Sequence, residues 1–158
     1  MKLIIGLGNP DDKYKENRHN VGQLFIDYLK EQKLKGVSLV KSSTFMNNSG
    51  EFVAKKVGRD FNLDNLFIVH DDLDIALGDY KIQKGKGPKE HRGLISIDEA
   101  LGRSDYWHVR IGVDSRDLGQ RIPGEVYVLE DFTESEKEIL RGVFGEIYLD
   151  LKSNYLNG

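Results

Sequence analysis

KLIIGLGNPDDKYKENRHNVG, residues 2–22, is the stretch that decides the fold. It opens with an apolar run, Leu3–Leu7, that is too short for a helix and is closed by Gly8 and Pro10. Such a run predicts a buried strand. The apolar residues of 21–29 then recur at the spacing of one helical face and predict a helix. The stretch therefore predicts a strand that leads into a helix through a polar loop.

That polar loop carries the first candidate site residues, Asn9 and His19. In an open α/β sheet, ligands bind beyond the carboxyl ends of the strands, which is where this loop is expected to lie. An amide next to an imidazole suits hydrolysis, because the amide can donate to a carbonyl while the imidazole takes a proton from water.

The rest of the chain predicts further alternation of strands and helices. We expect strands within 33–41 and at 66–69, 79–83, 107–113 and 125–129, and helices at about 52–61, 94–101 and 133–154. Ser49 is the expected N-cap of the first of these helices, and Thr133-x-x-Glu136 is a capping box for the last. The alternation predicts a three-layer α/β/α sandwich. No repeat or linker divides the chain, so we expect a single domain over 1–158.

Composition limits the classes of protein. The 158 residues, of which 39% are hydrophobic, suit one domain with one core. The chain has no cysteine, which excludes a disulfide framework and thiol catalysis. Its amino-terminal apolar run is too short for a secretory signal or a membrane span. We therefore expect a cytoplasmic protein without a membrane partner.

The charge is unevenly distributed, although the net charge is only −3. Residues 81–92 are basic, and residues 123–151 are mostly acidic. One basic stretch opposite an acidic end can orient a polyanion. Ordinary solvated surface is the alternative interpretation, and the charges alone do not decide between the two.

Polar clusters follow other strands and loops of the predicted sheet: Asn47-Asn48, Asp71 and His91-Arg92. A histidine with a carboxylate and two amides is the set of groups needed to activate a water and hold a carbonyl. Because the chain has neither a cysteine nor a Gly-x-Ser-x-Gly elbow, we expect the nucleophile to be water.

Two other interpretations start from short motifs. Gly6-Leu7-Gly8 follows a strand, but the dinucleotide-binding fingerprint needs a third glycine where Asp11 stands. Residues 70–74, His-Asp-Asp-Leu-Asp, offer several oxygens on one strand end and suit magnesium or manganese. A metal-dependent hydrolase therefore remains an alternative.

The chain resembles the bacterial-type peptidyl-tRNA hydrolase family. The matching pieces, in the order of the family, are LIIGLGNP (3–10), Tyr14, RHNVG (18–22), STFMNNSG (43–50), HDDLD (70–74), HxGL (91–94), VRIG (109–112) and EVYVL (125–129). The resemblance implies a mixed, mostly parallel sheet between helices. It also implies hydrolysis of the ester that joins a peptide to the terminal ribose of tRNA, without a metal or other cofactor.

The resemblance also implies roles for single residues. His19 resembles the catalytic base and Asp71 the carboxylate that holds it, while Asn9 and Asn47 match the amides that position substrate and water. Tyr14 and Met46 match residues that line the crevice for the peptide and the terminal nucleotide. We expect three further residues to bind substrate: Phe45, His91 and Arg92.

The substrate partner implied is peptidyl-tRNA, bound through its acceptor stem and CCA end by a monomeric protein. Arg110 matches a residue that grips the 5′-phosphate, which suits the planar fork of a guanidinium. The family's second phosphate-binding lysine falls at Gln83, with Lys81 and Lys84 close by. We expect these two lysines to bind tRNA phosphates.

Two departures from the family support a second hypothesis. Arg92 stands where the family has an asparagine, and arginine cannot accept a hydrogen bond. The region between the first helix and Ser42 is some twenty residues shorter than is usual, and this region normally supplies a pair of strands. The alternative function is therefore a tRNA- or RNA-binding relative with weak or no hydrolase activity.

Overall fold

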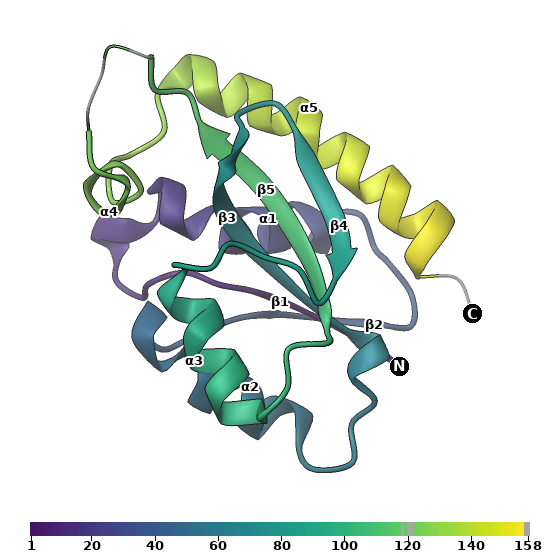
Figure 1. The fold of residues 1–158 in the computed structure, drawn as a ribbon. Helices are drawn as coiled ribbons and strands as arrows, with labels where there is room; N and C mark the ends of the chain where they lie inside the picture. Colours follow the sequence, from purple (N-terminus) through teal and green to yellow (C-terminus); the bar gives the residue numbers. More distant parts are fainter. Residues whose placement is uncertain (118, 120–121, 157–158) are drawn as a thin grey trace.

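The computed structural model describes residues 1–117, 119 and 122–156, and its centre is a five-stranded sheet (Figure 1). The strands are β1 (Lys2–Gly6), β2 (Val37–Lys41), β3 (Leu66–Ala76), β4 (Tyr80–Lys84) and β5 (Trp107–Asp114). Their order is β2-β1-β3-β5-β4. All neighbouring pairs are parallel except β4, which runs antiparallel to β5. The sheet is therefore mixed and mostly parallel, as the sequence predicts.

Helices cover both faces of the sheet, which confirms the three-layer prediction. They are α1 (Val21–Lys30), α2 (Ser49–Val57), α3 (Arg92–Leu101), α4 (Gly124–Tyr127) and α5 (Glu134–Asp150), and a π-helical turn (Leu151–Tyr155) extends α5. Alternate residues of β1 point to opposite faces: Ile4 packs with α1 and α5, while Leu3 and Ile5 pack with α2 and α3. This explains why β1 reads as a continuous apolar run, since both of its faces are buried.

Two glycines let helices approach the backbone closely. A Cβ on Gly22 of α1 would lie 2.3 Å from the carbonyl oxygen of Val69 in β3. A Cβ on Gly50 of α2 would lie 2.0 Å from the carbonyl oxygen of Ser96 in α3. The close approach at Gly22 brings the start of α1 directly onto the sheet, three residues after His19.

The structure corrects the sequence predictions at three places. Residues 125–129, predicted as a strand, overlap the short helix α4 (Gly124–Tyr127), and Tyr127 and Val128 are adjacent buried residues rather than alternating ones. β3 continues to Ala76, so Asp71 lies within the strand and not after it. α2 begins at Ser49, with Asn48 as an N-cap that makes no side-chain cap bond.

Other local predictions are confirmed. The capping box of Thr133 and Glu136 is present at the start of α5. The short region after α1 holds a single edge strand, β2. Among the residues that the structure describes, no helix has the length and apolar character needed to cross a membrane.

Candidate active site

The sheet brings His19 and Asp71 together although they are far apart in the chain. His19 lies in a 3-10 turn (Arg18–Asn20) before α1. Its Nδ1 lies 2.9 Å from each carboxylate oxygen of Asp71. A carboxylate only accepts hydrogen bonds, so the ring proton of His19 is on Nδ1. Nε2 is therefore left to accept a proton from a water molecule.

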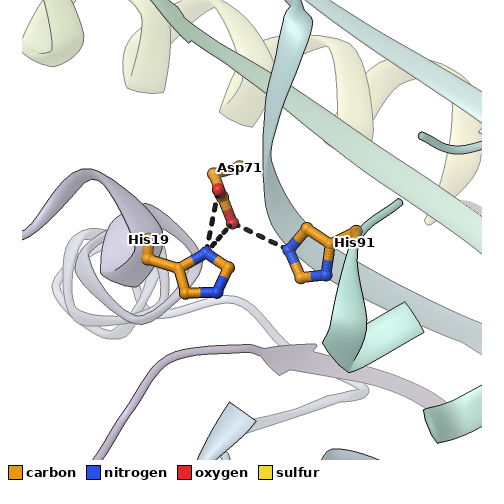
Figure 2. Close-up of side chains that lie close together, drawn as sticks. All are labelled: His19, Asp71 and His91. Carbon is orange, nitrogen blue, oxygen red and sulfur yellow. Dashed lines mark hydrogen bonds and ion pairs between the residues drawn. The ribbon is translucent and has the colours of Figure 1, made fainter. Parts of the chain in front are cut away.

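A second imidazole, His91, contacts the same carboxylate (Figure 2). His91 is the N-cap of α3, and the backbone N–H of Leu94 donates to its Nδ1 at 3.3 Å. The proton of this ring is therefore on Nε2, which donates to Oδ1 of Asp71 at 2.8 Å. Asp71 thus accepts from two imidazoles whose tautomers are fixed by their hydrogen-bond partners.

The electrostatics of this group favour a charged Asp71. Burial alone would raise the pKa of Asp71, but the charges and hydrogen bonds of His19 and His91 hold it well below its usual range. Burial alone would lower the pKa of His19, but the charge and hydrogen bond of Asp71 raise it above its ordinary value of 6.5. Asp71 therefore both orients His19 and makes it a stronger base.

Asn9 presents its amide beside these groups. The N–H of Met46 donates to Oδ1 of Asn9 at 2.7 Å, so the NH₂ group of Asn9 remains as a donor. Asn9 is itself held by the buried Asn20, whose side chain bonds the backbone N–H of Asn9 at 2.8 Å and its carbonyl at 2.9 Å. Asn20 is absent from the residues that the sequence predicts for the site. Its only signal in the sequence is its place in the same loop, one residue after His19.

An open cavity of about 1470 Å³ collects most of the predicted residues. The predicted residues that line it are Asn9, His19, Phe45, Met46, Asn47, Asp71, His91, Arg92 and Arg110. Its other walls include the loop 86–90 and residues 123–126, 128 and 129. The cavity is thus lined by an oriented imidazole and an amide donor, and it is open to solvent.

The sequence matches a model of a known protein family. The model of the family described as peptidyl-tRNA hydrolase matches residues 3–155. The chain belongs to the peptidyl-tRNA hydrolase family.

Individual members of the peptidyl-tRNA hydrolase family agree with this assignment. The peptidyl-tRNA hydrolase of Campylobacter concisus is 40% identical over 156 residues, which cover 89% of this chain and 81% of that protein. That of Pseudothermotoga lettingae is 40% identical over 157 residues, with 89% and 82% covered. The crystal structure of the Acinetobacter baumannii peptidyl-tRNA hydrolase superposes with a TM-score of 0.80 at 25% identity, covering 96% of this chain and 87% of that one.

These matches support the hydrolase hypothesis and not its alternative. Membership of the peptidyl-tRNA hydrolase family assigns the chain to the ester hydrolases that act on peptidyl-tRNA. The hypothesis of an RNA-binding relative without efficient hydrolysis receives no support from the matches.

The remaining predicted residues lie outside the cavity or are hydrogen-bonded or ion-paired to other residues of the protein. Tyr14 packs edge-on against Phe45, with 6.5 Å between the ring centroids, and does not itself line the cavity. Lys81 and Lys84 lie on β4 away from it, and Lys84 pairs with Asp64.

Arg110 reaches the cavity but is almost completely buried, with 6% of its surface exposed. Its Nε donates to Asp72 at 2.7 Å, and one terminal nitrogen donates to Gln83 at 2.6 Å. Sequence spacing does not indicate these two partners, because they lie on the strands that flank β5.

One group of described residues has the spacing of metal ligands: donor atoms of His19, Asp71 and His91 lie within 4.8 Å of one another. A metal on Nε2 of His91 would move the ring proton to Nδ1, where it would face the N–H of Leu94. Histidines that bind metals instead donate their other N–H to an acceptor. The group is therefore arranged to hold protons and fits a metal poorly.

The hard-metal site predicted at 70–74 does not assemble among the described residues. Asp71 faces the imidazoles, Asp72 pairs with Arg110, and Asp74 is exposed. The oxygens of this run therefore do not converge on one point.

The other two histidines of the chain lie behind the site. His70 donates from Nδ1 to the carbonyl of Asp71 at 3.0 Å and accepts at Nε2 from Nδ1 of His108 at 2.9 Å. Burial, together with the nearby His91 and His108, holds the pKa of His70 well below its ordinary value. Burial and the charge of Arg110 lower the pKa of His108 to about 4. Both rings are therefore neutral at pH 7 and serve as buried hydrogen-bonding groups.

Proposed function

We propose that the chain hydrolyses peptidyl-tRNA with His19 as general base. Nε2 of His19 takes a proton from a water molecule, and the oxygen of that water attacks the ester carbonyl. The NH₂ group of Asn9, together with the exposed amide of Asn47, donates to the oxyanion that forms. The ester bond then breaks, and the ribose oxygen takes the proton from His19. The products are a tRNA with a free terminal hydroxyl and a peptide carboxylic acid, which becomes a carboxylate by releasing its proton to solvent.

One observation carries this proposal: an imidazole with a fixed tautomer, whose Nε2 has no hydrogen-bond partner among the described residues, lines the same open cavity as an oriented amide donor. A binding module has no need of a buried carboxylate that raises the pKa of an imidazole. The same carboxylate stabilises the imidazolium that forms during attack.

We propose that different walls of the cavity bind chemically different parts of the substrate. Phe45 and Met46 offer apolar contact to the peptide and the terminal nucleotide, together with the exposed side chains of Val126 and Leu129. Lys86, Lys89 and Arg92 give one wall a positive charge that suits the acceptor stem and CCA end of tRNA.

Two of the three guanidinium nitrogens of Arg110 bond to Asp72 and Gln83. We propose that the other terminal nitrogen binds the 5′-phosphate. Lys81 and Lys84 lie farther out, where a longer part of the stem would pass. Such contacts grip the backbone and read no base sequence.

Replacing His19 with alanine tests the proposed base. We expect hydrolysis of a defined N-acetylaminoacyl-tRNA to fall by about 10²- to 10⁴-fold, because the variant has no proton acceptor at this position. We expect the Kd for the same tRNA to change little, because the basic wall is untouched. Single-turnover release of tRNA and filter binding measure the two quantities. A variant that still hydrolyses at the normal rate would exclude His19 as the base.

Replacing Lys89 with alanine tests the basic wall. We expect weaker tRNA binding and a slope of log Kd against log salt that is shallower by about 0.7–0.9, because one phosphate fewer is neutralised. Lys30→Ala is the matched control, because Lys30 is also exposed but ends α1 and does not line the cavity. Equal effects of the two substitutions would mean that the wall does not bind tRNA.

We further propose that the chain acts as a single domain and a monomer in the cytoplasm, where translation supplies peptidyl-tRNA. Membership of a family that acts on a translation intermediate supports this location. Sedimentation at working concentrations tests the oligomeric state.

A further inference from the structure

Arg18, the residue before the proposed base, is buried with 6% of its surface exposed. Its guanidinium carbon lies 3.9 Å from the centre of the Tyr127 ring. One terminal nitrogen donates to the carbonyl of Tyr127 at 3.1 Å, and the other donates to Oε1 of Glu136 at 2.8 Å. The side chain therefore binds α4 and the start of α5, and it is not among the residues that line the cavity.

Glu136 joins several segments through one carboxylate. As the third residue of α5 it completes the capping box, with Oε1 accepting from the N–H of Thr133 at 2.8 Å. Its Oε2 accepts from the hydroxyl of Ser115, just after β5, at 2.7 Å. Burial alone would raise the pKa of Glu136, but the donors Thr133, Ser115 and Arg18 lower it. The carboxylate of Glu136 is thus charged, and both of its oxygens accept hydrogen bonds, one of which comes from Arg18.

The backbone of the turn that holds Arg18 and His19 is hydrogen-bonded to the segment 128–130, just after α4. The N–H of Arg18 donates to the carbonyl of Glu130 at 3.1 Å, and the N–H of His19 donates to the carbonyl of Val128 at 2.8 Å. Figure 1 shows α4 beside the amino-terminal segment that leads into α1. Residues 123–126, 128 and 129 also form a wall of the cavity. The His19 turn is therefore hydrogen-bonded directly to the segment that forms this cavity wall, as well as being held against the sheet.

We propose that Arg18 and Glu136 are positioning residues for hydrolysis, whose ion pair holds the His19 turn and the cavity wall 123–129 in one frame. The proposal rests on His19 being the base. Misplacing a catalytic group by about 1 Å costs roughly 10²-fold in rate, so a frame of this kind has a large kinetic effect. Because the pair touches no substrate, its contribution is geometric.

Glu136→Gln is the first test variant. Glutamine keeps the shape of the side chain but removes the buried charge partner of the guanidinium, which is left with only the longer pair to the half-exposed Glu130 at 3.8 Å. We expect kcat for a defined peptidyl-tRNA to fall at least tenfold and KM to rise, measured well below the melting temperature. Arg18→Lys keeps the charge but lacks the planar fork, and we expect an intermediate kcat.

The double variant Arg18→Met with Glu136→Gln separates positioning from stability. With neither charge left unpaired, the melting temperature should return toward that of the parent. The bond to the carbonyl of Tyr127 is still missing, so kcat should remain at least tenfold low.

Phe144→Leu is the matched control on α5. Phe144 packs against Phe25 and Tyr28 in the core, away from the cavity. This variant should melt at a lower temperature and keep its kcat. The proposal is overturned if kcat follows the melting temperature across all four variants, or if Glu136→Gln hydrolyses at the parent rate. An active His19→Ala variant would instead overturn the assignment of the base, which is a separate result.

Discussion

Replacing Asp71 with asparagine should reduce kcat by about 10²- to 10⁴-fold, the usual contribution of an oriented general base. It should also move the acid limb of the pH profile to lower pH. With His19 as the proposed base, hydrolysis needs the neutral ring, so kcat/KM rises with pH through a pKa that Asp71 holds above 6.5 in the free protein. Without the negative charge, burial alone acts on His19 and lowers its pKa.

The measurement is kcat/KM against pH for the parent and the variant, because this quantity reports the pKa of His19 in the free protein. Asp79→Asn is the matched control, because Asp79 is an exposed carboxylate just past β3 that does not line the cavity. This control should keep both the rate and the acid limb of the parent. An acid limb that stays in place, or moves to higher pH, in Asp71→Asn would contradict the assigned pairing.

Gly22→Ala should destabilise the protein strongly. Its added Cβ would lie 2.3 Å from the carbonyl oxygen of Val69 and 2.8 Å from the backbone nitrogen of Leu7. Both atoms belong to the backbone and cannot rotate away. Overpacking of this kind costs about 1–3 kcal/mol or more, which lowers the melting temperature of a domain of this size by roughly 2–12 °C.

Gly142→Ala is the control for this substitution. Gly142 lies on the exposed side of α5, and an added Cβ there has no described atom within 4 Å. Alanine in a helix interior should instead raise the free energy of unfolding by about 0.5–1 kcal/mol. Circular dichroism melts of both variants give the comparison. If Gly22→Ala melted with the parent, the close approach of α1 to β3 would be wrong.

Elements whose signals are local can be predicted from the sequence. The apolar run of β1 and the capping box at Thr133 need only a few neighbouring residues, and both are confirmed. The prediction of a strand at 125–129 is wrong because its apolar residues resemble a strand, whereas tertiary contacts decide its structure. Tyr127 lies beneath the guanidinium of Arg18, and its hydroxyl donates to the carbonyl of Val113.

The candidate site is predictable in its residue types but not in its connections. No spacing rule links His19 to Asp71, which are 52 residues apart: the residue types suggest a histidine with a carboxylate, and only the family resemblance names these two as partners. His91 is expected from the sequence to bind substrate, yet its Nε2 is bonded to Asp71. Arg18 and Glu136 escape prediction because a buried ion pair between distant segments has no pattern in the linear sequence.

The bond between Arg18 and Glu136 spans 118 positions of the chain. A ribosome therefore adds the turn of the proposed base, His19, well before it adds Glu136, whose carboxylate binds that turn through Arg18. A nascent chain that contains all five strands has Asp71 to orient the imidazole but still lacks the ion pair between Arg18 and Glu136. If this ion pair positions the base as we propose, full activity requires that the first turn of α5 has been added.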